Sequence, residues 1–147
     1  MEKLPKQPDT PQTLEEKREQ KLLQTVSELL KIKRGINFLH GVPFVYESVP
    51  GNKEDEVNKD QPAKGMMIPT NDPMAHYEGI YEVYLVGVWE GVPEKYKPIL
   101  IAHELKEHDS NSHDEALKYE MEIARRMLSD EELEEYKEWR KKYDKKI

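Results

Sequence analysis

The residues best suited to chemistry in this sequence are histidines and glutamates of one short segment. His103 and Glu107 are four residues apart, so on a helix their side chains share one face. His113 and Glu120 are seven residues apart, which is two helical turns and again one face. Imidazole nitrogens and carboxylate oxygens are both common ligands of Zn²⁺. Two facing helices would therefore bring four metal-capable side chains together.

Glu104 adds a second chemical function, because it directly follows the first histidine. In the zinc-protease motif H-E-x-x-H, the glutamate at this place is the general base, and the metal lowers the pKa of the attacking water. Glu107 stands where that motif has its second histidine, and a carboxylate is still a competent ligand. We therefore expect Glu104 to be the catalytic base. The expected Zn²⁺ ligands are His103, Glu107, His113 and Glu120, the last either as a ligand or as the group that orients one.

These residues resemble the motif of the zincin metallopeptidases. The closer similarity is to small proteins with H-E-x-x-E followed by A/S-H-x-x-A-x-x-x-E, and it covers roughly residues 65–128. The resemblance implies a zinc-dependent hydrolase that cleaves an amide bond in a peptide or protein, with an edge strand before the motif helix bordering the cleft. The chain departs from the peptidases at the second histidine and has no Met-turn. The matching positions are His103, Glu104, Glu107, His113, Ala116 and Glu120.

The elements that must position these residues are three helices in the second half of the chain. The first is expected from about Glu94 or Tyr96 to His108, with apolar residues directly before His103. Ser112 then begins a second helix, which runs to about Leu128. A third follows, with acidic residues first and basic residues last, an order that complements the helix dipole. Capping-box patterns occur at Ser112–Glu115 and Ser129–Glu132.

The first half of the chain predicts one helix and several strands. Thr13 and Glu16 form a capping box for a helix that runs to about Lys33, before Gly35. Strands are expected in three segments. The last of them has the strongest alternation of side chains between the two faces of a strand, and it follows a turn at 70–74. The segments are 36–49, as one bent strand or two short ones, 65–69 and 77–89. The apolar positions of the helix are Leu22, Leu23, Val26, Leu29 and Leu30.

This order of elements predicts an α+β fold, with a small mixed or antiparallel sheet packed against helices. Residues 1–12 contain three prolines and no apolar periodicity, so we expect a flexible tail. Residues 13–128 are then a single α+β zincin-like domain, and residues 129–147 are a C-terminal amphipathic helix. The charged segment 50–64 is expected to be a mobile loop.

The composition excludes several classes of site. The chain has 147 residues, a net charge of −7 and no cysteine, so disulfides, cysteine zinc fingers and a thiol nucleophile are excluded. The acidic balance disfavours nucleic-acid binding, which needs a basic surface. No segment has the length and apolarity of a membrane span, so we expect a cytoplasmic protein, or one of the host cytoplasm if the gene is viral. Charged residues make up 36% and are mainly Lys and Glu, which is typical of thermophiles.

Several alternatives stay open from the sequence. His103 and Glu107 could be exposed and form ion pairs with Lys106 or Lys118, and His108 competes as a ligand. The protein could be a non-catalytic interaction protein, a homodimer through its terminal helices, with a structural or vestigial metal site. It could also be a viral or mobile-element accessory protein. The aromatic residues of the last strand are expected to pack in the sheet, and a substrate-lining edge is their functional alternative.

Overall fold

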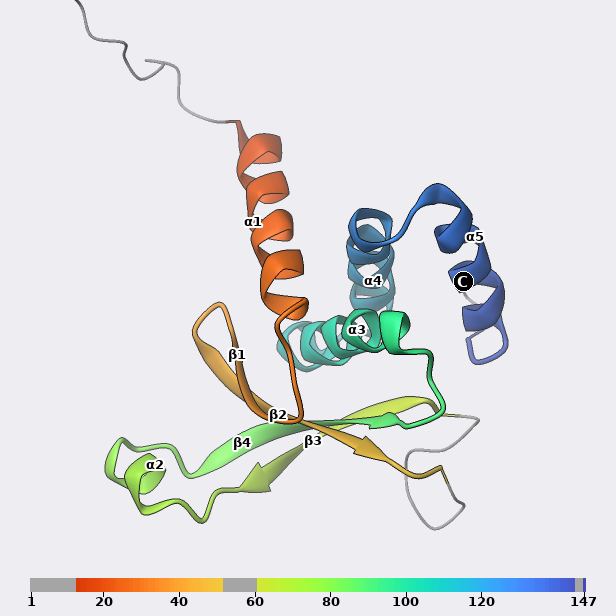
Figure 1. The fold of residues 1–147 in the computed structure, drawn as a ribbon. Helices are drawn as coiled ribbons and strands as arrows, with labels where there is room; N and C mark the ends of the chain where they lie inside the picture. The colour runs from red at the N-terminus through yellow and green to blue at the C-terminus, as the bar shows by residue number, and fades with distance from the viewer. Residues whose placement is uncertain (1–12, 52–60, 145–146) are drawn as a thin grey trace, which may run out of the picture.

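Four strands form one mixed sheet, and the long helices gather on one of its faces (Figure 1). The computed structural model describes residues 13–51, 61–144 and 147. The predicted tail at 1–12 and most of the charged loop between residues 50 and 64 lie outside the described residues. The α+β class predicted from the sequence is confirmed, and the sheet is of the mixed type.

The first helix, α1 (Leu14–Leu29), begins as predicted and ends earlier than predicted. Thr13 and Glu16 form the full capping box. The helix closes at Leu29 because the next backbone N–H groups bond three residues back, from Lys31 to Glu28 and from Ile32 to Leu29, which tightens the last turn. Its buried face is also narrower than the predicted one, since Leu23 is 52% exposed and Leu30 is 69% exposed.

The segment predicted as one or two strands is a hairpin of β1 (Gly35–Leu39) and β2 (Val42–Val49). Its two-residue turn has positive φ at both positions, 51° at His40 and 79° at Gly41. This conformation matches the natural twist of a two-stranded ribbon. Phe44 and Tyr46 of β2 turn inward and are buried under the helices.

The remaining strands are β3 (Ala63–Pro69) and β4 (Glu82–Trp89), connected through the short helix α2 (Pro73–Tyr77). The strand order is β1-β2-β4-β3, with β4 parallel to β2 and antiparallel to β3. The expectation of an edge strand directly before the motif helix is therefore wrong, because β4 is an interior strand and the edge strands are β1 and β3. Apolar residues on both faces of β4 fit this interior place. The predicted strand start at Tyr77 is also wrong, since that residue ends α2.

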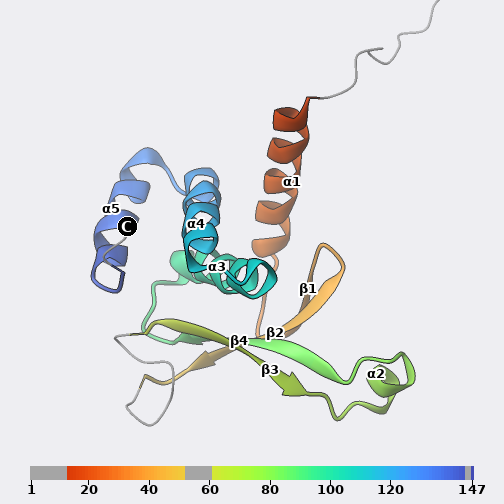
Figure 2. The same ribbon diagram turned by 180° about the vertical axis from the view of Figure 1, so that it is seen from behind.

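Three helices carry the candidate site. A 3₁₀ turn, η1 (Glu94–Tyr96), leads into α3 (Lys97–Ser110), which packs on β3 and β4. The helix α4 (His113–Met127) packs against α3 and α1, and α5 (Asp130–Lys141) packs against α4 on its outer side (Figure 2). Tyr136 of α5 is fully buried in the same core as the sheet residues. The core under α3 is built from Ile99, Leu100, Ile101, Ala102, Val86 and Val88.

The turn between α3 and α4 sets the angle at which the two motif segments face each other. Asn111 adopts the left-handed conformation, with φ of 54°, and ends α3. Ser112 then accepts a hydrogen bond from the backbone N–H of Glu115, but the return bond from the Glu115 side chain is not formed. The capping box predicted there is thus only half present, whereas the one at Ser129 is complete.

Among the described residues, no helix has the length and apolarity needed to cross a bilayer.

Candidate metal centre

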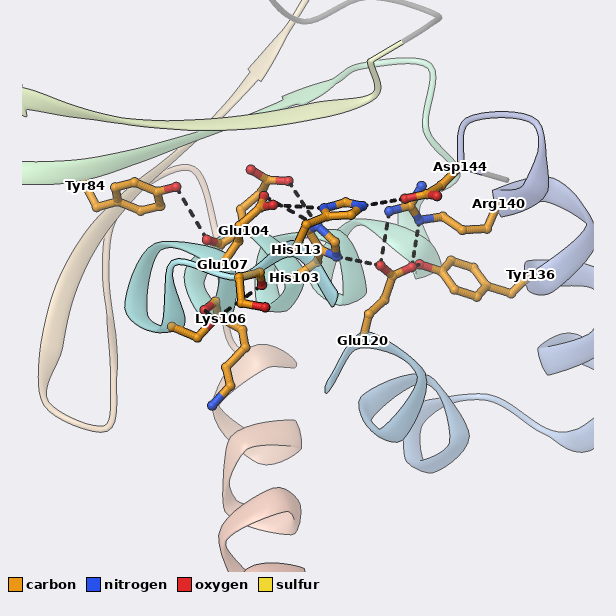
Figure 3. Close-up of polar contacts among 12 residues, drawn as sticks. Tyr84, His103, Glu104, Lys106, Glu107, His113, Glu120, Tyr136, Arg140 and Asp144 are labelled. Atoms are coloured by element: carbon orange, nitrogen blue, oxygen red, sulfur yellow. Dashed lines mark hydrogen bonds and ion pairs between the residues drawn. The ribbon is translucent and has the colours of Figure 1, made fainter. Parts of the chain in front are cut away.

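Three of the predicted ligands come together where α3 faces the start of α4. His103, Glu107 and His113 each offer one ligand atom, and these atoms lie within 4.8 Å of one another. Zn²⁺ forms bonds of roughly 2.0–2.2 Å to such ligands, so a small closing of the side chains brings them onto one ion. Two imidazoles and a carboxylate form a donor set that suits this metal. Figure 3 shows the three side chains pointing toward one another from the two helices.

His103 is held in a fixed orientation at the inner end of this cluster. The side chain is 2% exposed, and its Nδ1 lies 2.7 Å from Oε1 of Glu120. Because an ionised carboxylate can only accept, Nδ1 donates in this bond. The other ring nitrogen, Nε2, therefore faces the cluster, 3.7 Å from Oε1 of Glu107 and 3.9 Å from Oε2 of Glu104. This is the orientation that a metal-binding histidine needs.

The structure places Glu120 behind His103, with both of its oxygens engaged away from the cluster. The carboxylate is fully buried and accepts two hydrogen bonds from Arg140, of 2.7 Å from Nε and 3.1 Å from the terminal nitrogen. The hydroxyl of Tyr136 donates to Oε2 as well. Burial alone raises the pKa of Glu120, but the hydrogen bond from His103 and the charge of Arg140 outweigh it and hold the pKa below its usual value. Of the two roles predicted for Glu120, its contacts match that of an orienting group.

Glu107 and His113 form the outer part of the cluster. Oε2 of Glu107 lies 2.8 Å from Nδ1 of His113, and Nε2 of His113 lies 2.6 Å from Oδ2 of Asp144. Desolvation lowers the pKa of His113, but the bonds to Asp144 and Glu107 outweigh it and raise the pKa above its usual value. The His113 side chain is 41% exposed, so this end of the cluster is open to solvent.

Glu104 lies beside the cluster in a cavity of about 600 Å³. Its side chain is 14% exposed. Burial raises its pKa to about 7, with the positive charge of His103 opposing this and the negative charge of Glu107 adding to it. A carboxyl group with a pKa near 7 both accepts and returns protons at neutral pH, which suits a general base. The cavity is bounded by the edge strand β3 through Ala63, Lys64 and Gly65, and by Tyr84, Tyr143 and Asp144.

Tyr84 enters the same cavity from β4. Its hydroxyl lies 3.4 Å from the backbone carbonyl of Glu104, and its ring stacks on that of His108 with centroids 4.1 Å apart. Burial, together with the charges of Glu104 and Glu107, raises the pKa of Tyr84 to about 12, so the phenol stays protonated at neutral pH. The sheet position predicted for Tyr84 is confirmed.

The competing ligand candidate, His108, and the histidine of the β1–β2 turn, His40, lie away from the cluster. His108 lines a second cavity, between α1, α3, α4 and the sheet, and His40 pairs with Thr25 of α1. The predicted alternative of ion pairs with Lys106 or Lys118 is not seen among the described residues. Lys106 lies over the ring of Tyr119, at 5.3 Å, and Lys118 pairs with Glu115.

Sequence reasoning missed the groups that support the ligands from α5 and the residues after it. Arg140 and Tyr136 hold Glu120, and Asp144 holds His113. Their sequence signal is weak, because Arg140 and Asp144 stand in a run of charged residues. The one clue was Glu120, an acidic residue on an apolar helix face, which requires a buried partner.

No protein-family model matches this chain, and comparisons with curated proteins and with solved structures find no significant match.

Proposed function

We propose that this protein is a small zincin-like, zinc-dependent hydrolase that cleaves an amide bond in a peptide or protein. The observation that carries the proposal is the convergence of His103, Glu107 and His113 beside Glu104, in a cavity under the edge of the sheet. A bound Zn²⁺ would supply Lewis acidity, which lowers the pKa of a coordinated water and polarises a carbonyl group. His103, Glu107 and His113 would hold the ion.

The roles of the surrounding residues follow from their contacts. Glu120 positions His103 so that Nε2 faces the cavity, and Asp144 positions His113 in the same way through its Nε2. Glu104 takes the proton from the attacking water and later gives it to the leaving nitrogen. The cavity borders β3, and an edge strand of this kind can pair with an extended peptide.

The first test is metal content. Wild-type protein purified without added metal, and then dialysed against Zn²⁺, is expected to hold about one equivalent by mass spectrometry, with the His103→Ala variant holding less than about a tenth. His76→Ala is the matched control, because His76 bonds to the backbone of Thr70 outside the cluster. Equal zinc content in wild type and His103→Ala would overturn the metal site.

The second test is turnover. Zinc-loaded protein is expected to cleave fluorescein-labelled casein, and Glu104→Gln is expected to retain zinc while losing cleavage by at least about 100-fold. A Glu104→Gln variant that cleaves at the wild-type rate would remove the hydrolytic role and leave only a metal site.

A second candidate function, protein association, is favoured by the sheet face that lies away from the helices. Ile36, Val45, Leu85 and Met66 pair directly across the four strands. Side chains that stand opposite each other project from the same face. Their neighbour Phe44 is buried on the helix side, so this row lies on the other side, where Ile36 is 66% exposed and Met66 is 47% exposed. An apolar row of this kind is typical of an association surface.

Light scattering distinguishes a homodimer formed through the sheet face from one formed through the terminal helices. If the sheet face mediates a homodimer, Ile36→Ser is expected to give monomers, while Leu23→Ser, at a 52% exposed position of α1, stays dimeric. Dimers that survive Ile36→Ser but dissociate in Leu23→Ser would instead point to the terminal helix α1. A wild-type chain that is monomeric at all concentrations would exclude both.

A further inference from the structure

We propose that Tyr84 is a catalytic residue of this site, whose phenol donates a hydrogen bond to the substrate carbonyl oxygen as negative charge develops there. This rests on the proposed hydrolase function and adds to it a residue that the sequence motif does not contain. Tyr84 comes from the interior strand β4, 20 residues before Glu104 in the sequence, yet it lines the cavity that contains Glu104, Glu107 and His103.

The phenol of Tyr84 lies against the neighbouring strand β3, at a position where only a glycine leaves room for it. A Cβ atom added at Gly65 would lie 1.8 Å from the Tyr84 hydroxyl oxygen and 2.2 Å from Cζ. No side chain fits there while the phenol keeps its place. Gly65 stands on the edge strand β3, and the phenol of Tyr84 occupies the space that its side chain would fill. Stacking on His108 holds the ring from another direction.

The hydroxyl is available to a substrate. Its described partner is the backbone carbonyl of Glu104 at 3.4 Å, which is long for an O–H···O hydrogen bond, whose usual distance is roughly 2.7–2.8 Å. A bond this long is readily exchanged for a stronger one to an anionic oxygen. Arg140, a cation at the same cavity, is not free in this way, since it is 5% exposed and makes two hydrogen bonds to Glu120.

Amide hydrolysis places negative charge on the carbonyl oxygen, and such a donor stabilises that charge. The water oxygen forms a bond to the carbonyl carbon, and the proton that it loses moves to Glu104. The π electrons of the carbonyl bond move onto its oxygen, which becomes anionic and accepts the hydrogen bond from Tyr84. The C=O bond then re-forms, the C–N bond breaks, and the nitrogen leaves with the proton from Glu104. The carboxylic acid product keeps the other proton of the water.

The test is Tyr84→Phe in the zinc-loaded full chain, with fluorescein-labelled casein as the probe. We expect kcat to fall by about 100-fold, the usual effect of removing one such donor, with KM and zinc affinity unchanged. Tyr81→Phe is the matched control, because it removes the same hydroxyl from a tyrosine that is 62% exposed. Gly65→Ala displaces the phenol without altering it, so it should lower kcat similarly, and the double variant should lose no more than either single one.

Each possible result of these measurements either supports or overturns the role of Tyr84. A Tyr84→Phe variant within about threefold of wild-type kcat overturns the role of Tyr84 and leaves the hydrolase proposal standing. Parallel losses of zinc affinity and kcat overturn it as well, since Tyr84 would then act only on the structure of the site. A wild-type chain that binds zinc but cleaves nothing overturns the hydrolase proposal, and the role of Tyr84 falls with it.

Discussion

The two histidines of the candidate site are supported in opposite ways. His103 is 2% exposed and bonds to Glu120, which is itself fully buried and held by Arg140 and Tyr136. His113 is 41% exposed and bonds to Asp144, which follows the last helix. One ligand is therefore part of the core and the other is part of the surface. The stability of the metal-free protein should therefore depend mainly on the buried half, whereas metal affinity should depend on both halves.

The largest expected effect is on the buried half. Glu120→Ala leaves the buried charge of Arg140 without its partner, so the free energy of unfolding of the metal-free protein should fall by about 4 kcal/mol. Urea unfolding followed by circular dichroism measures it. Glu115→Ala is the control on the same helix, because its exposed pair with Lys118 is 3.9 Å long and should contribute less than about 0.5 kcal/mol. Equal losses in the two variants would contradict a special role for the Glu120 network.

The next effect compares the two histidines directly. His103→Ala and His113→Ala should each lower zinc affinity by at least about 100-fold, since each removes a ligand. Only His103→Ala should also lower the stability of the metal-free protein, because it leaves a buried cavity and removes a donor from Glu120. Competition with a chelating dye gives the affinities, and urea unfolding gives the stabilities. Similar stability losses in both variants would erase the distinction between a core ligand and a surface ligand.

The smallest effect concerns the outer half alone. Asp144→Asn keeps an acceptor for His113 but removes the charge that stabilises the imidazole as a ligand, so zinc affinity should fall by about 10-fold. Asp109→Asn, at the exposed end of α3, should leave the affinity unchanged. If Asp144→Asn instead abolished zinc binding, Asp144 would be a ligand itself and not an orienting group.

Much of the fold could be predicted from the sequence, because local signals dominate there. The caps at Thr13 and Ser129 and the break at Asn111 depend on hydrogen bonds and backbone conformations within a few residues. The strand order could not be predicted in this way. Whether β4 lies inside the sheet or at its edge depends on pairing with β2 and β3, which are distant in the sequence.

In the candidate site, too, local signals could be predicted and long-range contacts could not. His103, Glu107 and His113 could be placed together because helical spacing and one turn determine their approach. The partners of Glu120 could not be identified. Arg140 resembles the exposed charges around it in the sequence, and only the packing of α5 against α4 brings it to a buried carboxylate.

The position of Arg140 late in the chain has a consequence for biosynthesis. Because a protein leaves the ribosome from its N-terminus, α3 and α4 emerge before α5. Until Tyr136 and Arg140 have emerged, Glu120 has only His103 among its described side-chain partners. In a nascent chain, the candidate metal-binding side chains are therefore present before their geometry is fixed. The site is complete only when the last helix packs against α4.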